Sequence, residues 1–317
     1  KTLTKERNLA VILITHDMGV ISETADRVAV MKNGDLVEIG LTKEILTNPK
    51  EIYTKSLISS VPPTNKKISR FKIMEKKENS ERCTNIKILD RWNKKNLTSQ
   101  NLIEVKNLKK TFQEGMFTES SKNTVMAVDD VSFNIREGES FGLVGESGSG
   151  KSTIAKMIVN LFKPSSGEIF FDKVCITKIK KNSEMMNFRK QIQMIFQDPY
   201  SSLNGRLKVK DIIAEPIKLH NPKITNNDLD NYINDLLESV ELSKKSSTRY
   251  SHEFSGGQRQ RISIARALAT QPRLLVCDEP TSALDVSIQA QILNLLKDLQ
   301  EQLNLTILFI SHDLPVV

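Results

Sequence analysis

The chain has 317 residues, of which 38% are apolar, 26% charged and 5% aromatic, and its mean hydropathy is -0.32. This composition excludes a chain that is disordered throughout, and the length is enough for two domains. The longest strongly apolar stretch, Leu9 to Ile14, is far shorter than the roughly 18 to 20 residues that a membrane span needs. Three scattered cysteines exclude a disulfide framework and a paired Cys-x-x-Cys metal site, and they favour a reducing cytosol.

The formal net charge of +8 is concentrated in one stretch, residues 64 to 98. This stretch holds eleven Lys or Arg against four acidic residues, a local excess of seven positive charges. We interpret it as a solvated linker. Attraction to anionic lipid or to RNA is the alternative that such a basic run leaves open.

An apolar pattern near the start of the chain returns near its end. Leu9 to Asp17 predicts a fully buried strand followed by His-Asp, and the same pattern stands at Leu305 to Asp313. Residues 1–20 match residues 297–316 at eight of twenty positions without a gap. This internal repeat predicts a longer tandem protein, of which the sequence holds the tail of a first repeat, a linker and most of a second. With Lys1 rather than Met at its start, the chain is expected to be truncated at both ends.

The first repeat continues into a predicted hairpin. Two alternating strands, Arg27 to Met31 and Asp35 to Ile39, flank the pair Asn33-Gly34, which is a strong hairpin signal. A short helix is expected around Tyr53 to Leu57, before Pro62-Pro63. The predicted organisation is a C-terminal remnant of a first repeat at 1–62, a basic linker at 63–100 and a second repeat at 101–317 that ends before its own hairpin.

The second repeat has the pattern of an α/β domain. Its predicted strands are Leu102–Val105, Val131–Ile135, Ser140–Val144, Glu168–Phe171, Gln193–Phe196, Leu274–Cys277 and Thr306–Ile310. Apolar residues at helical spacing predict an amphipathic helix over residues 286–303 that packs against a sheet. Strands that alternate with helices are typical of βαβ units and predict a mostly parallel sheet.

A glycine loop follows the strand at 140–144 and opens a helix predicted over Lys151 to Phe162. Its residues are Gly145, Glu146, Ser147, Gly148, Ser149, Gly150, Lys151, Ser152 and Thr153. Strand, glycine loop and helix are the context that a phosphate-binding loop requires, because backbone N–H groups and the helix N-terminus then face one anion. Lys151 is predicted to reach the β- and γ-phosphates and Ser152 to ligate Mg²⁺, so the expected ligands are ATP and Mg²⁺.

Two acidic residues end the apolar strand at Leu274 to Cys277. Carboxyl ends of parallel strands face the same crevice as the phosphate loop, so Asp278 is predicted to hold Mg²⁺. Glu279 is the better candidate for polarising the attacking water, because a metal-bound carboxylate is a poor base.

A second candidate anion site precedes a helix predicted over Arg259 to Leu268. Ser255, Gly256, Gly257 and Gln258 combine a hydroxyl, two glycines and open N–H groups. The segment could equally be an ordinary helix cap. Two phosphate-type sites in one domain are redundant unless the second serves another domain's nucleotide.

The second repeat resembles ATP-binding cassette ATPases, most closely their peptide permease branch. Five motifs stand in the family's order: the phosphate loop at 145–153, the Q-loop at 196–199, the signature at 254–258, the Walker B strand and glutamate at 274–279, and the D-loop at 282–285 before the switch histidine, His312. The segments 197–204, 255–261 and 283–287 resemble the ATPases of oligopeptide, dipeptide and nickel importers. Residues 1–60 are similar to the end of a sister cassette, and the linker lies outside the resemblance.

The resemblance implies the fold of a P-loop NTPase, with a mostly parallel sheet core, an antiparallel β subdomain and a helical subdomain. It implies a head-to-tail pair of cassettes with ATP between the phosphate loop of one and the signature of the other, to which Asp285 of the D-loop contributes. Phe112 would stack on adenine, Gln197 would sense Mg²⁺ and His312 would steady the γ-phosphate, with His16 as its equivalent in the first cassette. Phe112, Phe254 and Gly205 stand where the family more often has Tyr, Leu and Pro, and none of these departures removes a catalytic group.

The resemblance further implies an ATPase that energises import of peptides or a related solute from the cytoplasmic face of the membrane. Its implied partners are a second cassette, intramolecular in the full tandem protein, transmembrane permease subunits and, indirectly, an extracytoplasmic solute-binding protein, with no nucleic acid. The alternative is a soluble tandem cassette ATPase that acts on the ribosome. Those proteins typically have Glu where this chain has Gln258, and the linker lacks a long amphipathic pattern.

Overall fold

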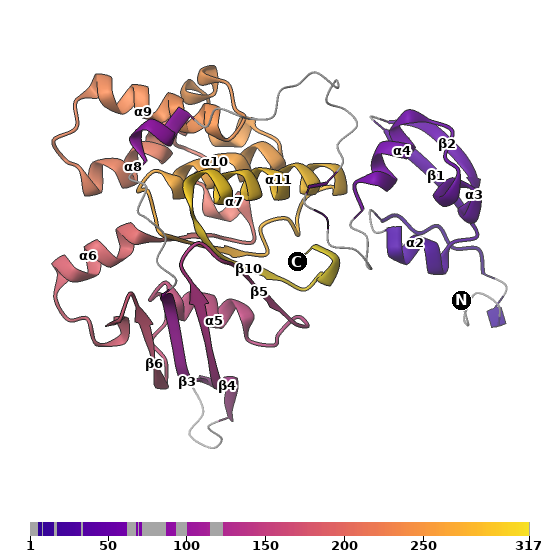
Figure 1. Cartoon of the computed structure of the whole chain (residues 1–317). Helices are drawn as coiled ribbons and strands as arrows, with labels where there is room; N and C mark the ends of the chain where they lie inside the picture. The colour runs from indigo at the N-terminus through magenta and orange to yellow at the C-terminus, as the bar shows by residue number, and fades with distance from the viewer. Residues whose placement is uncertain are drawn as a thin grey trace. The chain divides into compact units, whose positions relative to one another are not determined.

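The computed structural model describes residues 6–7, 9–15, 18–32, 34–61, 68, 70–71, 87–92, 100–114 and 123–316. The chain divides into two compact units, drawn in Figure 1. One unit comprises residues 1–81 with 284–294, and the other comprises residues 82–283 with 295–317.

The first unit contains the predicted hairpin. Strands β1 (Arg27–Lys32) and β2 (Asp35–Leu41) pair antiparallel around Gly34, whose φ of 92° is the left-handed conformation that a tight turn demands. The flanking helices are α2 (Met18–Thr24), α3 (Thr42–Thr47) and α4 (Ile52–Ser59). Val28 and Val30 of β1 form a small buried core with Ile45 of α3. The predicted hairpin and the predicted short helix, which is α4, are confirmed.

The buried strand predicted from Leu9 onward is wrong. Residues 9–15 have no regular secondary structure, and their apolar side chains are exposed, Ile12 by 92% and Ile14 by 93%. An apolar segment becomes a strand only where neighbouring strands take up its backbone N–H and C=O groups. Among the described residues no strand pairs with this segment.

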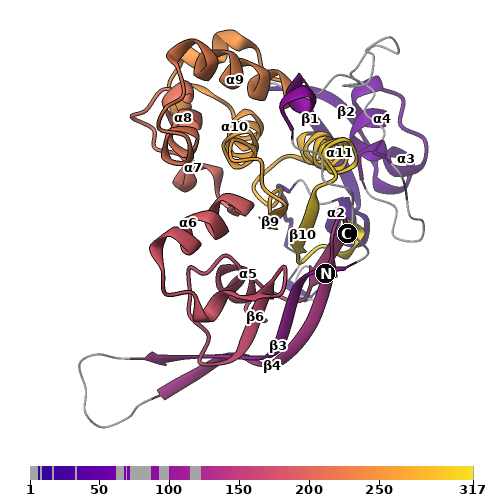
Figure 2. The same ribbon diagram turned by 60° about the vertical axis from the view of Figure 1, so that its left-hand side comes forward.

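The second unit contains an antiparallel sheet in the order β4-β3-β6-β7. Its strands are β3 (Asn101–Glu114), β4 (Asn123–Arg136), β6 (Ser166–Phe171) and β7 (Val174–Cys175). Figure 2 shows β3 and β4 as a long two-stranded ribbon that extends beyond β6. This sheet corresponds to the antiparallel subdomain that the resemblance implies.

The second sheet of this unit is parallel, in the order β5-β10-β9-β8. Its strands are β5 (Ser140–Val144), β8 (Ile192–Ile195), β9 (Leu274–Asp278) and β10 (Thr306–Ser311), which confirms the prediction of parallel strands. Every residue of β9 is buried, and β10 lies between β5 and β9. All four strands therefore end at one edge, where the candidate site residues are found.

The helices of the chain's later part connect the strands that follow β5 in the sequence. They are α5 (Lys151–Ile158), α6 (Asn182–Gln191), α7 (Pro199–Ser202), α8 (Val209–His220), α9 (Asn226–Ser239), α10 (Gly256–Leu268) and α11 (Val286–Leu303), with short 3-10 turns at Lys87–Arg91, Ile176–Lys178, Lys244–Thr248, Ser251–Glu253 and Leu314–Val316. In Figure 1, α8, α9 and α10 lie at the end of the unit opposite to β3, β4 and β6. The bounds predicted for 286–303 are confirmed, whereas α5 ends before Phe162 because Asn160 adopts a left-handed φ of 56°.

The main core of the second unit is contributed by both sheets and α5. It includes Ile154, Ile158, Phe171, Val276 and Leu308, which are all buried. The packing of α5 against this core fixes the end of the helix at which the glycine loop lies.

Part of the predicted linker is packed against the second unit. The 3-10 turn at Lys87–Arg91 contacts α9, and Ile88 and Trp92 are 0% and 8% exposed. Arg91 Nε lies 3.2 Å from Asp235 Oδ2, and Gln271 Nε2 donates a 3.0 Å hydrogen bond to Arg91 O. The expectation of a solvated segment is therefore wrong here, because burial of its apolar side chains outweighs the local positive charge.

Candidate functional site

The glycine loop between β5 and α5 has the geometry of an anion cradle. Gly148 and Gly150 adopt φ values of 83° and 93°, which are the left-handed conformations that curl the backbone. A Cβ at Gly150 would lie 2.2 Å from the carbonyl oxygen of Ala127 in β4, so only glycine fits there, whereas a Cβ at Gly148 would meet open space. The loop is thus braced by β4 on one side and open on another.

Lys151 closes the loop upon itself. Its side chain is buried, and Nζ donates hydrogen bonds of 2.7 Å to Gly145 O and 2.6 Å to Glu146 O, with Ser149 Oγ at 3.3 Å. The ammonium group is therefore held at the mouth of the loop by neutral oxygens rather than by a carboxylate. It remains a positive charge that phosphate oxygens can share.

Ser152 and Asp278 meet across the sheet edge. Ser152 Oγ, in the first turn of α5, donates a 2.8 Å hydrogen bond to Asp278 Oδ1, at the end of β9. Burial raises the pKa of Asp278, and the bond from Ser152 opposes that shift. A hydroxyl and a carboxylate are hard oxygen donors, the kind that Mg²⁺ takes in proteins, so the two residues fit the predicted metal.

Glu279 contacts two other predicted residues, Gln197 and His312. Gln197 Nε2 donates a 2.9 Å hydrogen bond to Glu279 Oε2, and His312 Nδ1 lies 3.2 Å from the same oxygen. Glu279 has a φ of 46°, which costs an L-residue roughly 1–2 kcal/mol, and its N–H donates to Ile310 O at 3.0 Å. This strained turn after β9 directs the carboxylate toward the residues that follow β8 and β10.

The position of Gln197 is fixed by the residue after it. The Asp198 carboxylate caps the short helix α7 by accepting from Tyr200 N at 2.8 Å and Ser201 N at 3.2 Å. These bonds, that from Tyr200 N first, lower the pKa of Asp198. The sequence signal for this cap is an Asp before a Pro at the first helical position.

The signature segment forms the N-terminus of α10. Ser255 N donates to Gln258 Oε1 at 3.1 Å and Gln258 N donates to Ser255 Oγ at 3.4 Å, the two halves of a capping box. Gly256 and Gly257 occupy the first turn. The segment is therefore a helix cap, as one reading of the sequence had it, and its service to a second nucleotide stays a prediction.

Three other predicted residues have roles that stay predictions. Phe112, in β3, is 36% exposed and packs edge-on against Phe162 at a centroid distance of 5.7 Å, so its predicted stacking on adenine stays a prediction. Asp285 lies just before α11 in the segment that belongs to the first unit, and its role also stays a prediction. His16 lies outside the described residues.

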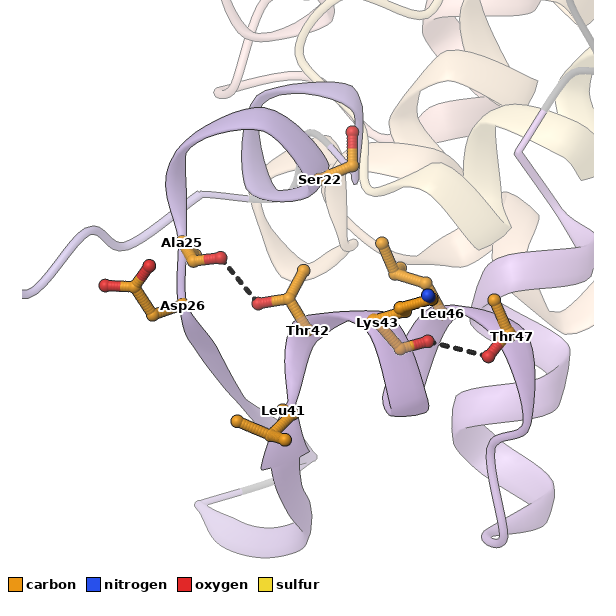
Figure 3. Close-up of a pocket in the computed structure, with 8 residues that line it drawn as sticks. All are labelled: Ser22, Ala25, Asp26, Leu41, Thr42, Lys43, Leu46 and Thr47. Atoms are coloured by element: carbon orange, nitrogen blue, oxygen red, sulfur yellow. Dashed lines mark hydrogen bonds between the residues drawn. The ribbon is translucent and has the colours of Figure 1, made fainter.

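A separate cavity of about 490 Å³ lies in the first unit and contains none of the predicted site residues. Figure 3 shows it around the start of α3, where Thr42 Oγ1 donates to Ala25 O and Thr47 Oγ1 donates to Lys43 O, each at 2.7 Å. Its lining residues are Ser22, Ala25, Asp26, Leu41, Thr42, Lys43, Leu46 and Thr47.

In the part of the chain that the structure describes, no helix is both long and apolar enough to cross a membrane.

Comparisons with known proteins agree on one family. Residues 128–282 match the model of the family described as ABC transporter. The chain is 56% identical over 216 residues to the oligopeptide transport ATP-binding protein OppF of Streptococcus mutans, covering 68% of this chain and 68% of that protein. It is 41% identical over 324 residues to the glutathione import ATP-binding protein GsiA of Escherichia coli, covering this whole chain and 51% of GsiA, so the chain spans about half the length of that relative.

Solved structures support the same assignment. A dimeric, post-hydrolysis structure of the ATP-binding cassette MJ0796 bound to ADP and Pi matches with a TM-score of 0.60 and 31% identity, covering 68% of this chain and 89% of that one. The matching structure therefore contains the products of ATP hydrolysis. The chain belongs to the ATP-binding cassette family, among the ATPases of ABC transporters.

Proposed function

We propose that this chain powers the import of oligopeptides, dipeptides or a related small solute by binding and hydrolysing ATP. Two relatives support this solute class, since one is named for oligopeptide transport and the other for import of glutathione, itself a tripeptide. The chain itself does not meet the solute. Its substrate is ATP, and its output is a change of conformation passed to membrane subunits.

The observation that carries the proposal is the arrangement at the carboxyl edge of the parallel sheet. A phosphate cradle with Lys151, a pair of hard oxygen donors at Ser152 and Asp278, and a carboxylate bonded by Gln197 lie on neighbouring elements of one unit. This arrangement supports the proposed roles in nucleotide binding, metal binding and polarisation of water.

Each group has one task in the proposed mechanism. The glycine loop and Lys151 bind the phosphates and orient them. Ser152 and Asp278 hold Mg²⁺, assisted by Gln197, and the metal supplies positive charge to the phosphate oxygens when bound. Glu279 accepts a hydrogen bond from the attacking water and polarises that water, while His312 steadies the γ-phosphate.

The site is proposed to be completed by a second cassette. The capping-box segment at 255–258 and Asp285 would face the nucleotide of a head-to-tail partner. In the full tandem protein that partner is the first cassette, whose C-terminal remnant is residues 1–62, joined to the second cassette at 101–317 by the basic linker at 63–100. The match to GsiA over the whole of this chain supports such an arrangement.

Transmembrane permease subunits are proposed to receive the conformational change driven by ATP. An extracytoplasmic solute-binding protein is proposed to deliver the solute to them. The ATPase would lie on the cytoplasmic face of the membrane as a peripheral subunit, with no nucleic-acid partner. The Q-loop that begins at Phe196 is the proposed link from the nucleotide to the permease.

The test is reconstitution of the full-length protein with its permease subunits in liposomes. Labelled di- to pentapeptides should accumulate only when ATP and Mg²⁺ are supplied on the ATPase side, and peptide with its binding protein should raise the rate of hydrolysis. A protein that hydrolyses ATP at a rate indifferent to peptides and that sediments with ribosomes would contradict the import proposal and support the ribosomal alternative.

A further inference from the structure

The chain segment that follows Gln197 is attached to α10 by two partly buried polar contacts. Arg266 Nη1 donates a 2.7 Å hydrogen bond to Ser202 O, and Ser202 Oγ lies 3.5 Å from Ser263 Oγ. Burial lowers the pKa of Arg266, yet a guanidinium stays charged in proteins, so this is a charged donor on a main-chain oxygen. The end of α7 is thereby bound to the C-terminal half of α10.

The next residues are attached to the turn that precedes the signature. Ser251 Oγ donates to Asn204 O at 3.2 Å, and His252 Nδ1 lies 2.9 Å from Gly205 O. Both acceptors are main-chain carbonyls of the segment that continues from α7. The path from Gln197 to Gly205 therefore runs along α10 and the 3-10 turn at Ser251–Glu253.

Arg259 joins these two contact regions. Its guanidinium carbon lies 4.1 Å from the centre of the Tyr200 ring, while Nε donates to Phe254 O at 2.9 Å and Nη2 donates to His252 O at 2.8 Å. One planar group thus stacks on α7 and binds the carbonyl of the residue directly before Ser255. A lysine could supply the charge but neither the stacking plane nor two directed N–H donors.

We propose that Arg259 is a positioning residue that makes the Gln197 segment and the signature turn move as one body. Gln197 contacts Glu279 of this cassette, and Ser255 directly follows Phe254, the residue whose carbonyl oxygen Arg259 binds. A change at the cis nucleotide that moves Gln197 is thereby transmitted to the segment that faces the partner's nucleotide. The inference rests on the proposed pairing of two cassettes.

The test compares four variants of the full-length tandem protein. Arg259→Lys and Tyr200→Ala should each lower kcat about 5-fold, as expected for loss of one partly exposed cation–π contact, while ATP binding at equilibrium and KM stay within about two-fold. The double variant should be no slower than the slower single variant, because both changes remove the same contact. Tyr200 is 56% exposed, so its truncation tests the contact without opening the core.

Arg249→Lys is the matched control. Arg249 also stacks on an aromatic ring, Phe254 at 4.4 Å, and donates to Glu253 O at 2.8 Å, and these contacts do not reach α7. Its kcat should stay within two-fold of the wild type. Wild-type kcat in Arg259→Lys, or additive losses in the double variant, would overturn the inference. A wild-type protein that hydrolyses ATP but transports no peptide would refute the import proposal alone.

Discussion

Two copies of one sequence pattern adopt different structures in this chain. Leu305–Ile310 is buried in the middle of a parallel sheet, with strands on both sides, and Leu308 is 0% exposed. The equivalent Leu9–Ile14 has no regular structure, and Ile12, which aligns with Leu308, is 92% exposed. The pattern encodes a preference for burial, but the strand itself requires partners from distant parts of a chain.

The largest expected effect comes from a change in the candidate site next to the second copy of the pattern, compared with the same change in the first unit. Glu279→Gln should lower the turnover of ATP by about 10² to 10⁴-fold and leave ATP binding in place, because the amide cannot polarise water but Lys151 and the glycine loop are untouched. Steady-state hydrolysis and equilibrium binding of labelled ATP measure the two quantities. Glu38→Gln makes the same chemical change in the hairpin of the first unit, where Glu38 accepts from Lys50 N and Glu51 N, and should leave turnover unchanged.

Unchanged hydrolysis in Glu279→Gln would remove this residue from the proposed role. Loss of ATP binding in the same variant would instead place Glu279 in the binding of the nucleotide, which the geometry of its contacts with Gln197 and His312 does not support.

The next effect compares the two copies directly. Leu308→Ala should lower the free energy of unfolding by about 2–5 kcal/mol, because it leaves a cavity at a fully buried position. Ile12→Ala in this same chain should change it by less than about 0.5 kcal/mol, because the side chain already contacts water. Urea unfolding of the two variants, followed by circular dichroism, measures both values, and equal losses would contradict the contrast between the copies.

This contrast also explains what sequence reasoning could and could not predict. The hairpin around Gly34, α11 and the parallel strands follow from local turn chemistry and periodicity, and the convergence of Ser152 with Asp278 follows from the rule that parallel strands end at one edge. The failed strand at Leu9–Ile14 depends on partners that no local pattern reveals. The contact between Arg259 and Tyr200 is not predictable from the sequence for the same reason, since it joins separate helices and has no characteristic sequence spacing.

Two glycines, one in each unit, differ in how closely other atoms approach the position that a Cβ would take. Gly34 and Gly167 adopt nearly the same φ, 92° and 88°, but a Cβ at Gly34 meets nothing within 4 Å, whereas a Cβ at Gly167 would lie 2.3 Å from Asn107 O. Gly34→Ala should cost about 1 kcal/mol through its left-handed backbone alone. Gly167→Ala adds a clash with main-chain atoms of β3 and should cost about 3 kcal/mol.

Amide hydrogen exchange resolves the two losses, with β1 amides reporting on Gly34→Ala and β6 amides on Gly167→Ala. A similar loss in both variants would mean that the backbone conformation dominates and that the crowding at Gly167 is relieved by small shifts.

The smallest expected effect concerns the segment between the two copies. Trp92 is the only tryptophan of the chain and is 8% exposed, so its fluorescence reports on the packing of Lys87–Arg91 against α9 and should be blue-shifted in the folded protein. Asp235→Asn removes the partner of Arg91, whose side chain is 41% exposed, and should weaken this packing by at most about 1 kcal/mol. The emission should then shift to the red at a lower urea concentration than in the wild type. Water-exposed emission in the native wild type would mean that this segment, like Leu9–Ile14, has a preference for burial that the rest of the chain does not satisfy.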